Sequence, residues 1–350
     1  MEILNIANTI EGASGVATFV RELNSALNSR GVKSAVAVGS SGRGPDIVHI
    51  HGLWLGMYHE AAKWAKANGI PVVWSTHGMT APWSMRHKRW KKLPAWWLYQ
   101  KRDLQNAVAI HCTTEQEAEW NRSLGFNNCF VVPLGTREIF NHVEQVEHAE
   151  KRLLFVGRIH PVKGLSNLIR AWSLVQDPTC STCSTWLKKQ WKLRFVGPDE
   201  ANHLSFLKSE VRSLGLEGSV EFAGPRFGSE LSAEYDNCDC LVLPSFTENF
   251  GATVIDAMAH GKPVIASSFT PWRILRDKNC GWWVSNEPEK LAAAIREMAQ
   301  AADAERKAMG ERGRRLVEER YTWKYAANTL AGVYALLAGH RSLKSLETTL

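Results

Sequence analysis

The residues with the clearest chemical potential lie in the segment 243–265, LPSFTENFGATVIDAMAHGKPVI. Glu248 and Asp256 are eight residues apart, one in a loop and one about two turns into the helix that the pattern predicts after Gly251. The first turn of a helix offers unpaired N–H groups and a positive dipole end, which suit a phosphate. The two carboxylates are too far apart to share a proton, but they could accept hydrogen bonds from ribose or hexose hydroxyls. The alternative is a helix N-terminus in which the acidic residues interact favourably with the helix dipole and the small residues allow close packing.

A second loop with chemical potential is VGRIHPVKG at 156–164, which also follows an apolar run and precedes a helical pattern. Arg158 can bind two phosphate oxygens at once, and Lys163 can add a point charge. The alternative is a pair of solvated surface cations.

Histidines mark a third place. His77 follows an apolar run, and a side chain at the carboxyl end of a buried strand can reach a ligand. His49 and His51 flank a similar strand end and are weaker candidates. The alternative is that His77 is a structural residue whose hydrogen bonds are satisfied within the fold.

Two nucleotide-binding motifs are missing. The first loop, EGASGV at 11–16, is rich in glycine but is not GxGxxG, and no acid ends the second strand to bind a ribose. No GxxxxGK[ST] is present either. The sequence therefore argues against dinucleotide binding and against P-loop chemistry.

Alternating strands and helices must position these loops, and the strands are continuous apolar runs typical of buried parallel strands. Strands are predicted at 3–7, 34–38, 47–51, 71–75, 108–112, 153–156, 193–196, 220–222, 240–243, 264–266 and 282–284. Helices are predicted at 16–29, 58–68, 95–105, 115–123, 164–175, 204–214, 251–260, 288–299, 304–318 and 323–337. This pattern indicates an α/β fold with two doubly wound parallel sheets.

A polar stretch at 142–151 without apolar periodicity predicts a linker between two similar halves. We expect domains at 1–145 and 146–322, a C-terminal helix at 323–340 that packs toward the N-terminal domain, and a loose tail at 341–350. Ligands of such sheets bind outside the carboxyl ends of the strands, so a cleft between the halves is the expected site.

Composition fits a globular protein of 350 residues with 45% hydrophobic and 22% charged residues. No apolar run reaches 18 residues, and the N-terminus reads as a strand and not as a signal peptide, so we expect a cytoplasmic protein. Seven cysteines include one CxxC, Cys180 with Cys183, which lacks a second pair for zinc. The net charge of +7 suits an anionic ligand or surface.

Together these loops resemble the retaining glycosyltransferases of family 4, which have the GT-B fold of two Rossmann-like domains. The family's hallmark is a pair of glutamates in P-S-x-x-E-x-F-G followed by E-A-M-A-x-G-x-P-V-I, matched here at 244–251 and 256–265. The family's loop of glycine and arginine after a strand, followed by lysine and glycine, is matched by Gly157, Arg158, Lys163 and Gly164.

 The four residues 159–162 lie between the arginine and the lysine of that loop. Ser14-Gly15-Val16 stands for the N-terminal G-G-V-like loop, with serine in place of one glycine. The resemblance covers nearly the whole chain and is strongest from 153 to 265.

The resemblance implies a role for each matched position in a donor site for a nucleotide-diphosphate sugar. Arg158 and Lys163 would bind the diphosphate, Glu248 would contact the donor sugar, and Asp256 would bind the ribose hydroxyls. Asp256 stands where the family has glutamate and is shorter by about 1.5 Å, so its ribose contact is either direct or through water. Arg226 would lie next to the nucleobase of the donor. The other implied donor-binding residues are Gly15, Asn249, Phe250, Gly251 and Ala252.

The resemblance also implies that the catalytic residues are Glu248, His77, Arg158 and Lys163. His77 belongs to the N-terminal, acceptor-binding domain and would contact the donor sugar from there. The reaction implied is transfer to a saccharide with retention of anomeric configuration, in bacterial cell-surface polysaccharide synthesis. The departing phosphate would accept the acceptor's proton on the same face. No metal and no cofactor is expected in this scheme, since Arg158 and Lys163 would carry the charge of the leaving diphosphate.

The segment 86–102, RHKRWKKLPAWWLYQKR, combines many cations with aromatic residues and contains no acid. Cations with interfacial aromatics suit an anionic membrane, and a lipid-linked acceptor would make peripheral binding to the inner face of the membrane coherent. The alternative is a solvated helix with its tryptophans packed inside; nucleic acid is not an expected partner. The candidate residues are Arg86, Lys88, Arg89, Trp90, Lys91, Lys92, Trp96 and Trp97.

Two other functions stay open at this point. A GT-B nucleotide-sugar epimerase would consume the donor without an acceptor, and a non-catalytic scaffold would bind a nucleotide sugar without releasing nucleotide. The arginine–lysine loop together with the Glu248 motif favours transfer.

Overall fold

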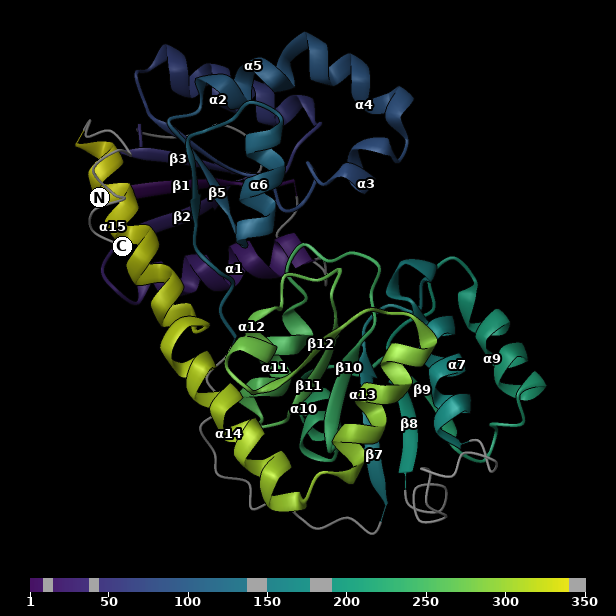
Figure 1. Ribbon diagram of the computed structural model, residues 1–350. Helices are drawn as coiled ribbons and strands as arrows, with labels where there is room; N and C mark the ends of the chain where they lie inside the picture. Colours follow the sequence, from purple (N-terminus) through teal and green to yellow (C-terminus); the bar gives the residue numbers. More distant parts are fainter. Residues whose placement is uncertain (9–14, 38–43, 137–149, 177–190, 340–350) are drawn as a thin grey trace. The chain divides into compact units, whose positions relative to one another are not determined.

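The computed structural model describes residues 1–8, 15–37, 44–136, 150–176 and 191–339 (Figure 1). The chain forms two compact units. Unit 1 comprises Met1–Gly135 with Arg320–Leu350, and unit 2 comprises Thr136–Glu319. The boundary expected between residues 145 and 146 lies outside the described residues, and so do the tail from residue 341 and the CxxC pair.

Unit 1 is built on a six-stranded sheet in which every neighbouring pair of strands is parallel. In spatial order its strands are β2 (Lys33–Ala37), β1 (Glu2–Ile6), β3 (Ile47–His51), β4 (Val72–Ser75), β5 (Ala109–Cys112) and β6 (Cys129–Val131). Its helices are α1 (Gly15–Asn28), α2 (Gly56–Ala67), α3 (Pro82–Arg86), α4 (Arg89–Ala95), the π-helix η1 (Trp96–Gln100), α5 (Lys101–Asn106), α6 (Glu115–Ser123) and α15 (Trp323–Ala338).

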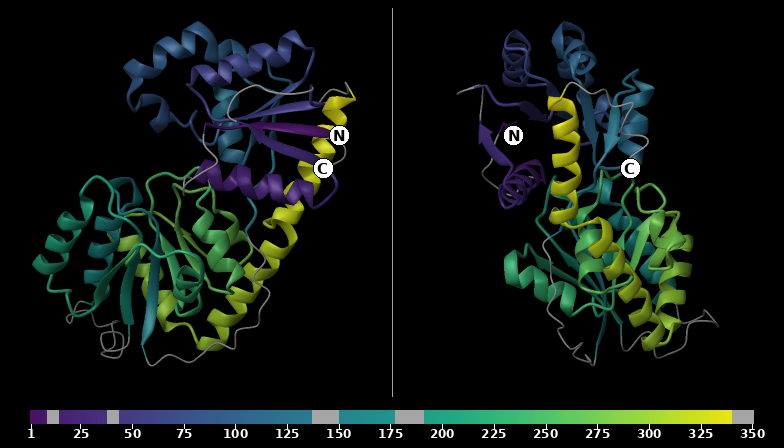
Figure 2. Two further views of the ribbon diagram at one scale, coloured as in Figure 1. Left: turned by 180° about the vertical axis from the view of Figure 1, so that it is seen from behind. Right: turned by 90° about the vertical axis from the view of Figure 1, so that its left-hand side faces the viewer.

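The two faces of this sheet bury separate apolar clusters. Ile3 joins the cluster under α1 and α15, whereas the next residue, Leu4, joins the cluster under α2. Successive side chains of a strand point to opposite faces, so a strand buried on both sides must be apolar throughout. The last described helix, α15, lies beside α1, although the two are far apart in sequence (Figure 2).

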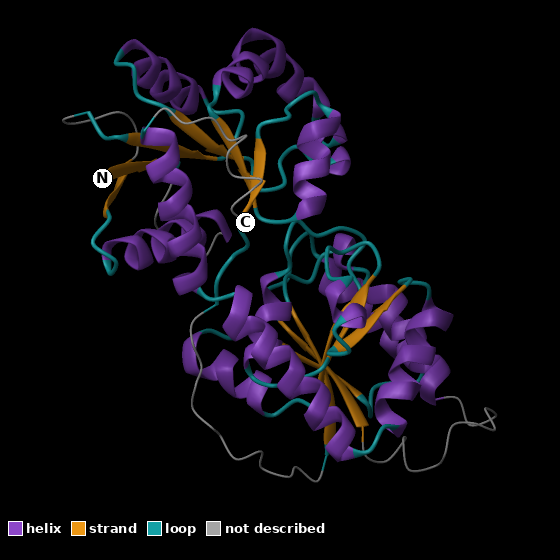
Figure 3. Cartoon of the chain, turned by 60° about the vertical axis from the view of Figure 1, so that its left-hand side comes forward, coloured by secondary structure: helices purple, strands orange, loops and turns teal. Residues whose placement is uncertain are grey.

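Unit 2 repeats the architecture with a second six-stranded parallel sheet and helices on both of its faces (Figure 3). In spatial order its strands are β12 (Gly281–Val284), β11 (Val264–Ser267), β10 (Cys240–Leu243), β7 (Lys151–Val156), β8 (Trp191–Val196) and β9 (Val220–Gly224). Its helices are the 3₁₀-helix η2 (Pro161–Lys163), α7 (Leu165–Gln176), α9 (His203–Ser213), α10 (Gly228–Asp236), α11 (Ala252–Ala259), α12 (Ile274–Asp277), α13 (Pro288–Gln300) and α14 (Asp303–Arg320).

The predicted α/β fold with two parallel sheets is confirmed, and several elements differ from the expectation. The strand β6 was not predicted, nor was the helix α10. The helix expected at 95–105 is part of a longer helical stretch in which α4, η1 and α5 follow one another without a break. A π-turn has more residues per turn than an α-helix, so α-helical periodicity could not place it.

Candidate active site

Two loops of unit 2 lie in contact at the carboxyl ends of β7 and β10. The strands are hydrogen-bonded neighbours, so the loops that follow them begin side by side. The backbone N–H of Phe246 donates to the carbonyl oxygen of Val162 at 2.9 Å. Gly164 has φ +67°, and a Cβ there would lie 2.3 Å from the carbonyl oxygen of Pro244. Only glycine permits both this backbone conformation and this close approach.

The side chains of Lys163 and Glu248 form an ion pair between these loops. Both are largely buried, with 14% and 12% of their side chains exposed. The hydroxyl of Ser245 donates to Glu248 Oε1 at 2.7 Å, which fixes that carboxylate further. The structure therefore brings together the cation and the acid that the sequence offered from two separate motifs.

The N-terminus of α11 lies directly beyond this pair in the chain. Its capping residue, Gly251, has φ +80° and supplies no side-chain hydrogen bond to the first turn. Trp272 Nε1 donates to the carbonyl oxygen of Phe250 at 2.5 Å, and the two rings meet edge to face. These contacts fix the loop while Ala252, the first residue of the helix, remains exposed. The helix start can therefore bind an anion with its backbone N–H groups.

Arg158 lies on the same loop as Lys163 but in a more open position. Its guanidinium pairs with Glu200 at 2.5 Å, and more than half of its side chain is exposed. An exposed ion pair contributes little to stability, so Arg158 can exchange this partner for an anionic ligand.

Asp256 has a partner that the sequence did not indicate. Its Oδ1 accepts a hydrogen bond from the Thr136 hydroxyl at 2.6 Å. Burial raises the pKa of the Asp256 carboxyl, and the Thr136 hydrogen bond and His260 oppose that rise. The Asp256 carboxylate is therefore already hydrogen-bonded to Thr136, the first residue of unit 2.

The two remaining donor candidates of unit 2 lie in different surroundings. Arg226 follows β9 and reaches Glu234 at 3.7 Å, and Glu234 is itself held by two hydrogen bonds of 2.7 Å from Arg194. Asn249 lies between Glu248 and Phe250 and is partly buried.

In unit 1, His77 lies two residues after the end of β4, at the start of a turn, and adopts φ +48°. The buried carboxylate of Glu117 accepts from the Thr76 hydroxyl at 2.7 Å and from the Gly78 N–H at 2.6 Å, which fixes both neighbours of His77. Burial lowers the pKa of His77 to about 4. The imidazole is therefore neutral near pH 7.

His49 and His51, the weaker candidates, are completely buried. His51 bridges the amide oxygen of Asn5, at 3.0 Å from its Nε2, and His77 Nε2, at 3.2 Å from its Nδ1. His49 bridges the Tyr334 hydroxyl, at 2.6 Å, and the Ser75 hydroxyl, at 2.7 Å. Both histidines thus have hydrogen-bond partners within the packing of unit 1.

Gly15 is the first residue of α1, and among the described residues no atom outside its own helix turn and chain neighbours lies within 4 Å of the position that a Cβ would take. The loop that precedes it, including Ser14, lies outside the described residues.

The basic, tryptophan-rich segment divides its tryptophans between the core and the surface. Trp96 is buried, whereas Trp90 and Trp97 are exposed by 73% and 70%. Cations stack on the exposed rings, with Lys91 Nζ 4.9 Å from the Trp90 ring and Lys101 Nζ 5.5 Å from the Trp97 ring. The alternative, a helix whose tryptophans pack inside, is therefore wrong for Trp90 and Trp97.

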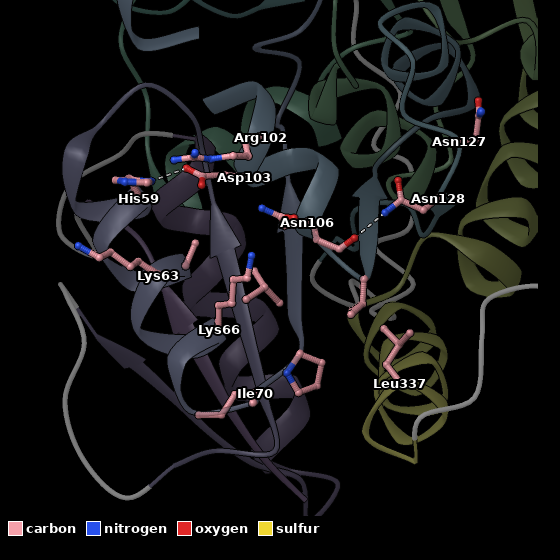
Figure 4. Close-up of a pocket in the computed structure, with 16 residues that line it drawn as sticks. His59, Lys63, Lys66, Ile70, Arg102, Asp103, Asn106, Asn127, Asn128 and Leu337 are labelled. Carbon is pink, nitrogen blue, oxygen red and sulfur yellow. Dashed lines mark hydrogen bonds and ion pairs between the residues drawn. The ribbon is translucent and has the colours of Figure 1, made fainter. Parts of the chain in front are cut away.

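A cavity of about 1140 Å³ in unit 1 is lined by residues that include His59, Lys66 and Asn128 (Figure 4). Its lining includes Val72, which begins β4, and Val108, which precedes β5. The amino ends of the strands meet there, so this cavity is not the site that the loops of the carboxyl ends would build.

Among the described residues, no group of three or more His, Cys, Asp or Glu side chains is placed to bind a metal ion. None of the described helices is both long and apolar enough to span a bilayer.

Two family models match the chain. Residues 136–316 match the model described as glycosyl transferases group 1, and residues 29–135 match the model described as a glycosyl transferase 4-like domain.

Curated relatives match about half of this chain. A D-inositol 3-phosphate glycosyltransferase of Kineococcus radiotolerans is 32% identical over 197 residues, which are 52% of this chain and 43% of that protein. An uncharacterised glycosyltransferase of Methanocaldococcus jannaschii is 28% identical over 193 residues, 55% of this chain and 46% of the relative. The matched region thus spans less than half the length of these relatives.

Solved structures share the fold over almost the whole chain. The sucrose-phosphate synthase of Thermosynechococcus elongatus has a TM-score of 0.76 and 19% identity, covering 97% of this chain and 99% of that one. HepE of Anabaena, solved in complex with UDP-glucose, has a TM-score of 0.70 and 16% identity, covering 96% and 99%. With the two parallel sheets and the motif loops on their carboxyl edges, these matches show that the chain belongs to the group 1 glycosyl transferases and has the GT-B fold.

Proposed function

We propose that this protein transfers a sugar from a nucleotide-diphosphate sugar to a saccharide acceptor. The observation that carries the proposal is the Lys163–Glu248 ion pair, built between two loops at the carboxyl ends of β7 and β10 and followed by the open N-terminus of α11. The Lys163 ammonium suits a phosphate, the Glu248 carboxylate suits sugar hydroxyls, and the N-terminus of α11 suits an anion.

Electrostatic stabilisation of the leaving diphosphate is the central step of the proposal. Negative charge grows on the diphosphate as the glycosidic bond breaks, and Lys163, Arg158 and the N–H groups of α11 oppose it. Removing one such preorganised group typically costs about 2.7–4 kcal/mol of transition-state stabilisation. Because these groups carry the charge, the proposed reaction needs no metal.

Retention of anomeric configuration is part of the proposal. The departing phosphate accepts the proton of the acceptor hydroxyl on the face from which it leaves, so no residue must act as a covalent nucleophile. Glu248 and the neutral imidazole of His77 contact the donor sugar in this scheme. Asp256, Asn249 and Arg226 bind the nucleoside part of the donor.

A uridine diphosphate sugar is the first donor to test, since a structure of the same fold was solved with UDP-glucose. The acceptor in this proposal is a saccharide linked to a lipid, used in polysaccharide synthesis.

Peripheral binding to an anionic membrane completes the proposal. The exposed rings of Trp90 and Trp97 and the cations beside them are placed to enter the interface of the bilayer. Flotation with vesicles that contain anionic lipid tests this part. Binding at low salt that a Trp90→Ala, Trp97→Ala double variant loses supports it, and failure of the unchanged protein to float contradicts it.

The main test is a thermal-shift panel of nucleotide sugars, followed by nucleotide release with each hit. Lys163→Ala and Glu248→Gln should remain folded and lose most turnover. Near-normal transfer by either variant contradicts the assigned roles, and a strict requirement for a divalent metal contradicts the metal-free reaction.

The same assays separate the alternatives. An epimerase would convert the sugar without an acceptor, and a scaffold would be stabilised by the donor without releasing nucleotide. Analysis of the product anomer tests retention.

A further inference from the structure

A line of three polar side chains runs from the core of unit 1 to His77. Asn5 lies in β1 and His51 ends β3, and the structure buries both side chains completely. His51 Nε2 lies 3.0 Å from Asn5 Oδ1, and His51 Nδ1 lies 3.2 Å from His77 Nε2. Strands β1 and β3 are hydrogen-bonded neighbours, so the sheet itself places Asn5 beside His51. The line therefore lies wholly within unit 1.

The amide of Asn5 sets the direction of hydrogen bonding along this line. Its Nδ2 donates to the Ser34 hydroxyl at 2.9 Å and to the carbonyl oxygen of Ala35 at 3.4 Å. A carbonyl oxygen can only accept, so the amide nitrogen must face Ala35 and the amide oxygen must face His51. The amide oxygen also only accepts, so His51 Nε2 must carry the proton of that contact.

His51 is neutral in these surroundings, so only one of its ring nitrogens carries a proton. The rings of Phe19 and His49 lie against it, with centroids 5.6 and 4.0 Å away. Its two hydrogen bonds to described residues go to Asn5 and His77, neither of which is an acid. Burial without a counter-charge disfavours the charged imidazole, and burial accordingly lowers the pKa of His51. With the proton on Nε2, the Nδ1 atom has only a lone pair.

The proton of the second contact must therefore come from His77. Because His51 Nδ1 can only accept, His77 Nε2 must donate to it. His77 is neutral as well, since burial lowers its pKa to about 4. The charge of Glu117 opposes that effect, but this carboxylate already accepts from the Thr76 hydroxyl and the Gly78 N–H. The Nδ1 atom of His77 consequently carries a lone pair and no proton.

This bare nitrogen is the end of the line that a ligand can reach. His77 is partly exposed, and its Nδ1 is neither hydrogen-bonded within the described parts of the chain nor closed off from solvent. The ring of Phe19 meets the imidazole edge to face, with centroids 5.1 Å apart. The Phe19 ring and the His51 contact together hold the imidazole with Nε2 toward the core and Nδ1 available.

We propose that Asn5 and His51 are positioning residues, which hold His77 as the Nε2–H tautomer so that its Nδ1 accepts a hydrogen bond from a sugar hydroxyl. The inference rests on the proposed function, in which His77 contacts the donor sugar. It gives that contact a polarity, since a nitrogen without a proton attracts a hydroxyl and repels the lone pairs of a carboxylate or a carbonyl. The site therefore selects a sugar that offers a hydrogen-bond donor at this position.

A second, separate line of hydrogen bonds supplies a matched control. His49 lies two residues before His51 in β3 and is equally buried. Its ring nitrogens bond to the hydroxyls of Tyr334 and Ser75, and neither bond involves His51 or His77. Leucine in place of His49 thus removes the same chemical group from the same strand and leaves the line to His77 intact.

Spectra of the ligand-free, full chain with ¹⁵N-labelled histidine test the proposal. A bare ring nitrogen and a protonated one resonate far apart, whereas rapid exchange between the two tautomers brings their signals together. His77→Asn identifies the His77 signals, since asparagine tolerates the positive φ at this position. Near neutral pH, the unchanged protein should show a bare Nδ1 and a protonated Nε2 for His77.

Leucine variants test the positioning roles. His51→Leu should draw the two His77 signals toward one another, because no acceptor then holds the proton on Nε2. Asn5→Leu acts one residue further along the line and should have the same effect to a smaller degree, and His49→Leu should leave both signals unchanged. A proton on Nδ1 in the unchanged protein overturns the inference without any leucine variant. His77 signals that stay the same in His51→Leu overturn it as well.

Affinities for UDP-glucose and UDP separate this inference from the proposed function. His51→Leu should weaken UDP-glucose about threefold to tenfold, as expected for one hydrogen bond between neutral groups, and leave UDP unchanged. Equal weakening of both probes would indicate a general loss of structure and contradict a positioning role. If UDP-glucose does not bind the unchanged protein, the proposed donor is wrong, while the ligand-free spectra still decide which tautomer His77 adopts.

Discussion

At the scale of single residues, Lys163 and Glu248 depend on one another before any ligand arrives. Each side chain is largely buried, and the charge of each is balanced by the other, with Ser245 as a further donor to the carboxylate. A diphosphate that engages Lys163 must compete with this carboxylate, and a sugar hydroxyl that engages Glu248 must compete with the ammonium. In the function that we propose, the pair holds both groups in place and loosens when the donor binds.

A double-mutant cycle on the free protein measures this dependence. Lys163→Met and Glu248→Gln should each lower the free energy of unfolding, because each leaves a buried partner unpaired. The double variant should lose less than the sum of the two, with a coupling energy of about 0.5–3 kcal/mol. Urea unfolding of the four proteins provides the measurement. Additive losses would show that the two side chains do not interact in solution.

At the scale of elements, the contact between the loops after β7 and β10 depends on glycine. Gly164 and Gly215 have nearly the same φ, +67° and +65°, but only Gly164 has an atom close to the position of a Cβ. Gly215→Ala should cost the backbone strain alone, about 1–2 kcal/mol. Gly164→Ala should cost more, since the backbone of Pro244 must also move, and it should weaken donor binding. Equal losses of stability in the two variants would mean that the loops are not packed as described.

Histidines in β3 and β5, together with the partly buried His77 after β4, should make the stability of unit 1 depend on pH. Burial lowers the pKa values of His49 and His51, and neighbouring histidines lower them further. Burial also lowers the pKa of His111, but the hydrogen bond to Val132 and the charge of Glu117 oppose this effect. With His77, all four have folded-state pKa values below the unfolded value of 6.5. The unfolded chain therefore binds more protons below that pH.

The sign of the pH dependence follows. The stabilisation is complete above about pH 6.5 and is lost as the pH falls toward 4, the region in which His77 titrates in the folded state. Each histidine that must charge on unfolding contributes up to about 1.4 kcal/mol per pH unit. Denaturant midpoints between pH 7.5 and about 4.5 should fall steeply in the wild type and less steeply in His49→Gln, provided that variant folds. A flat profile in the wild type would show that these imidazoles are not held neutral.

The sequence predicted most strands of both sheets because parallel strands buried on both faces are apolar runs that need no alternation. Residues 264–266 are such a run, and the structure buries all three of them in β11. Cys129–Val131 is too short to stand out, and only Glu234 and Tyr235 are buried in Gly228–Asp236, so neither element left a periodic signal.

The partners within the site could be predicted less well. Lys163 and Glu248 lie 85 residues apart, and their pairing depends on β7 and β10 being neighbours, which chain order does not reveal. The same limit applies to Asp256 with Thr136, which are 120 residues apart. Trp96 is buried and Trp97 is exposed, and the π-turn that contains both shifts the α-helical period from which their burial could be predicted.

At the scale of the whole molecule, the chain returns to unit 1 at its end. The apolar face of α15 completes the core that covers one side of the first sheet, with Leu330 and Tyr334 fully buried against residues of α1 and the strands. The Tyr334 hydroxyl also forms a hydrogen bond with His49 Nδ1, 285 residues earlier in the sequence. Unit 1 therefore needs both ends of the chain, whereas unit 2 is one continuous stretch.

Leu330→Ala should consequently weaken one unit and spare the other. Truncating a buried leucine costs about 2–5 kcal/mol. Hydrogen exchange should accelerate in 15–135 and 320–339 and stay unchanged in 150–319, because the lost contacts all belong to the core of unit 1. Lys324→Ala, on the exposed side of the same helix, is the matched control and should leave both regions unchanged. If exchange rises equally in both units, they unfold as one cooperative body, and the division of the chain into two independently stabilised sheets is wrong.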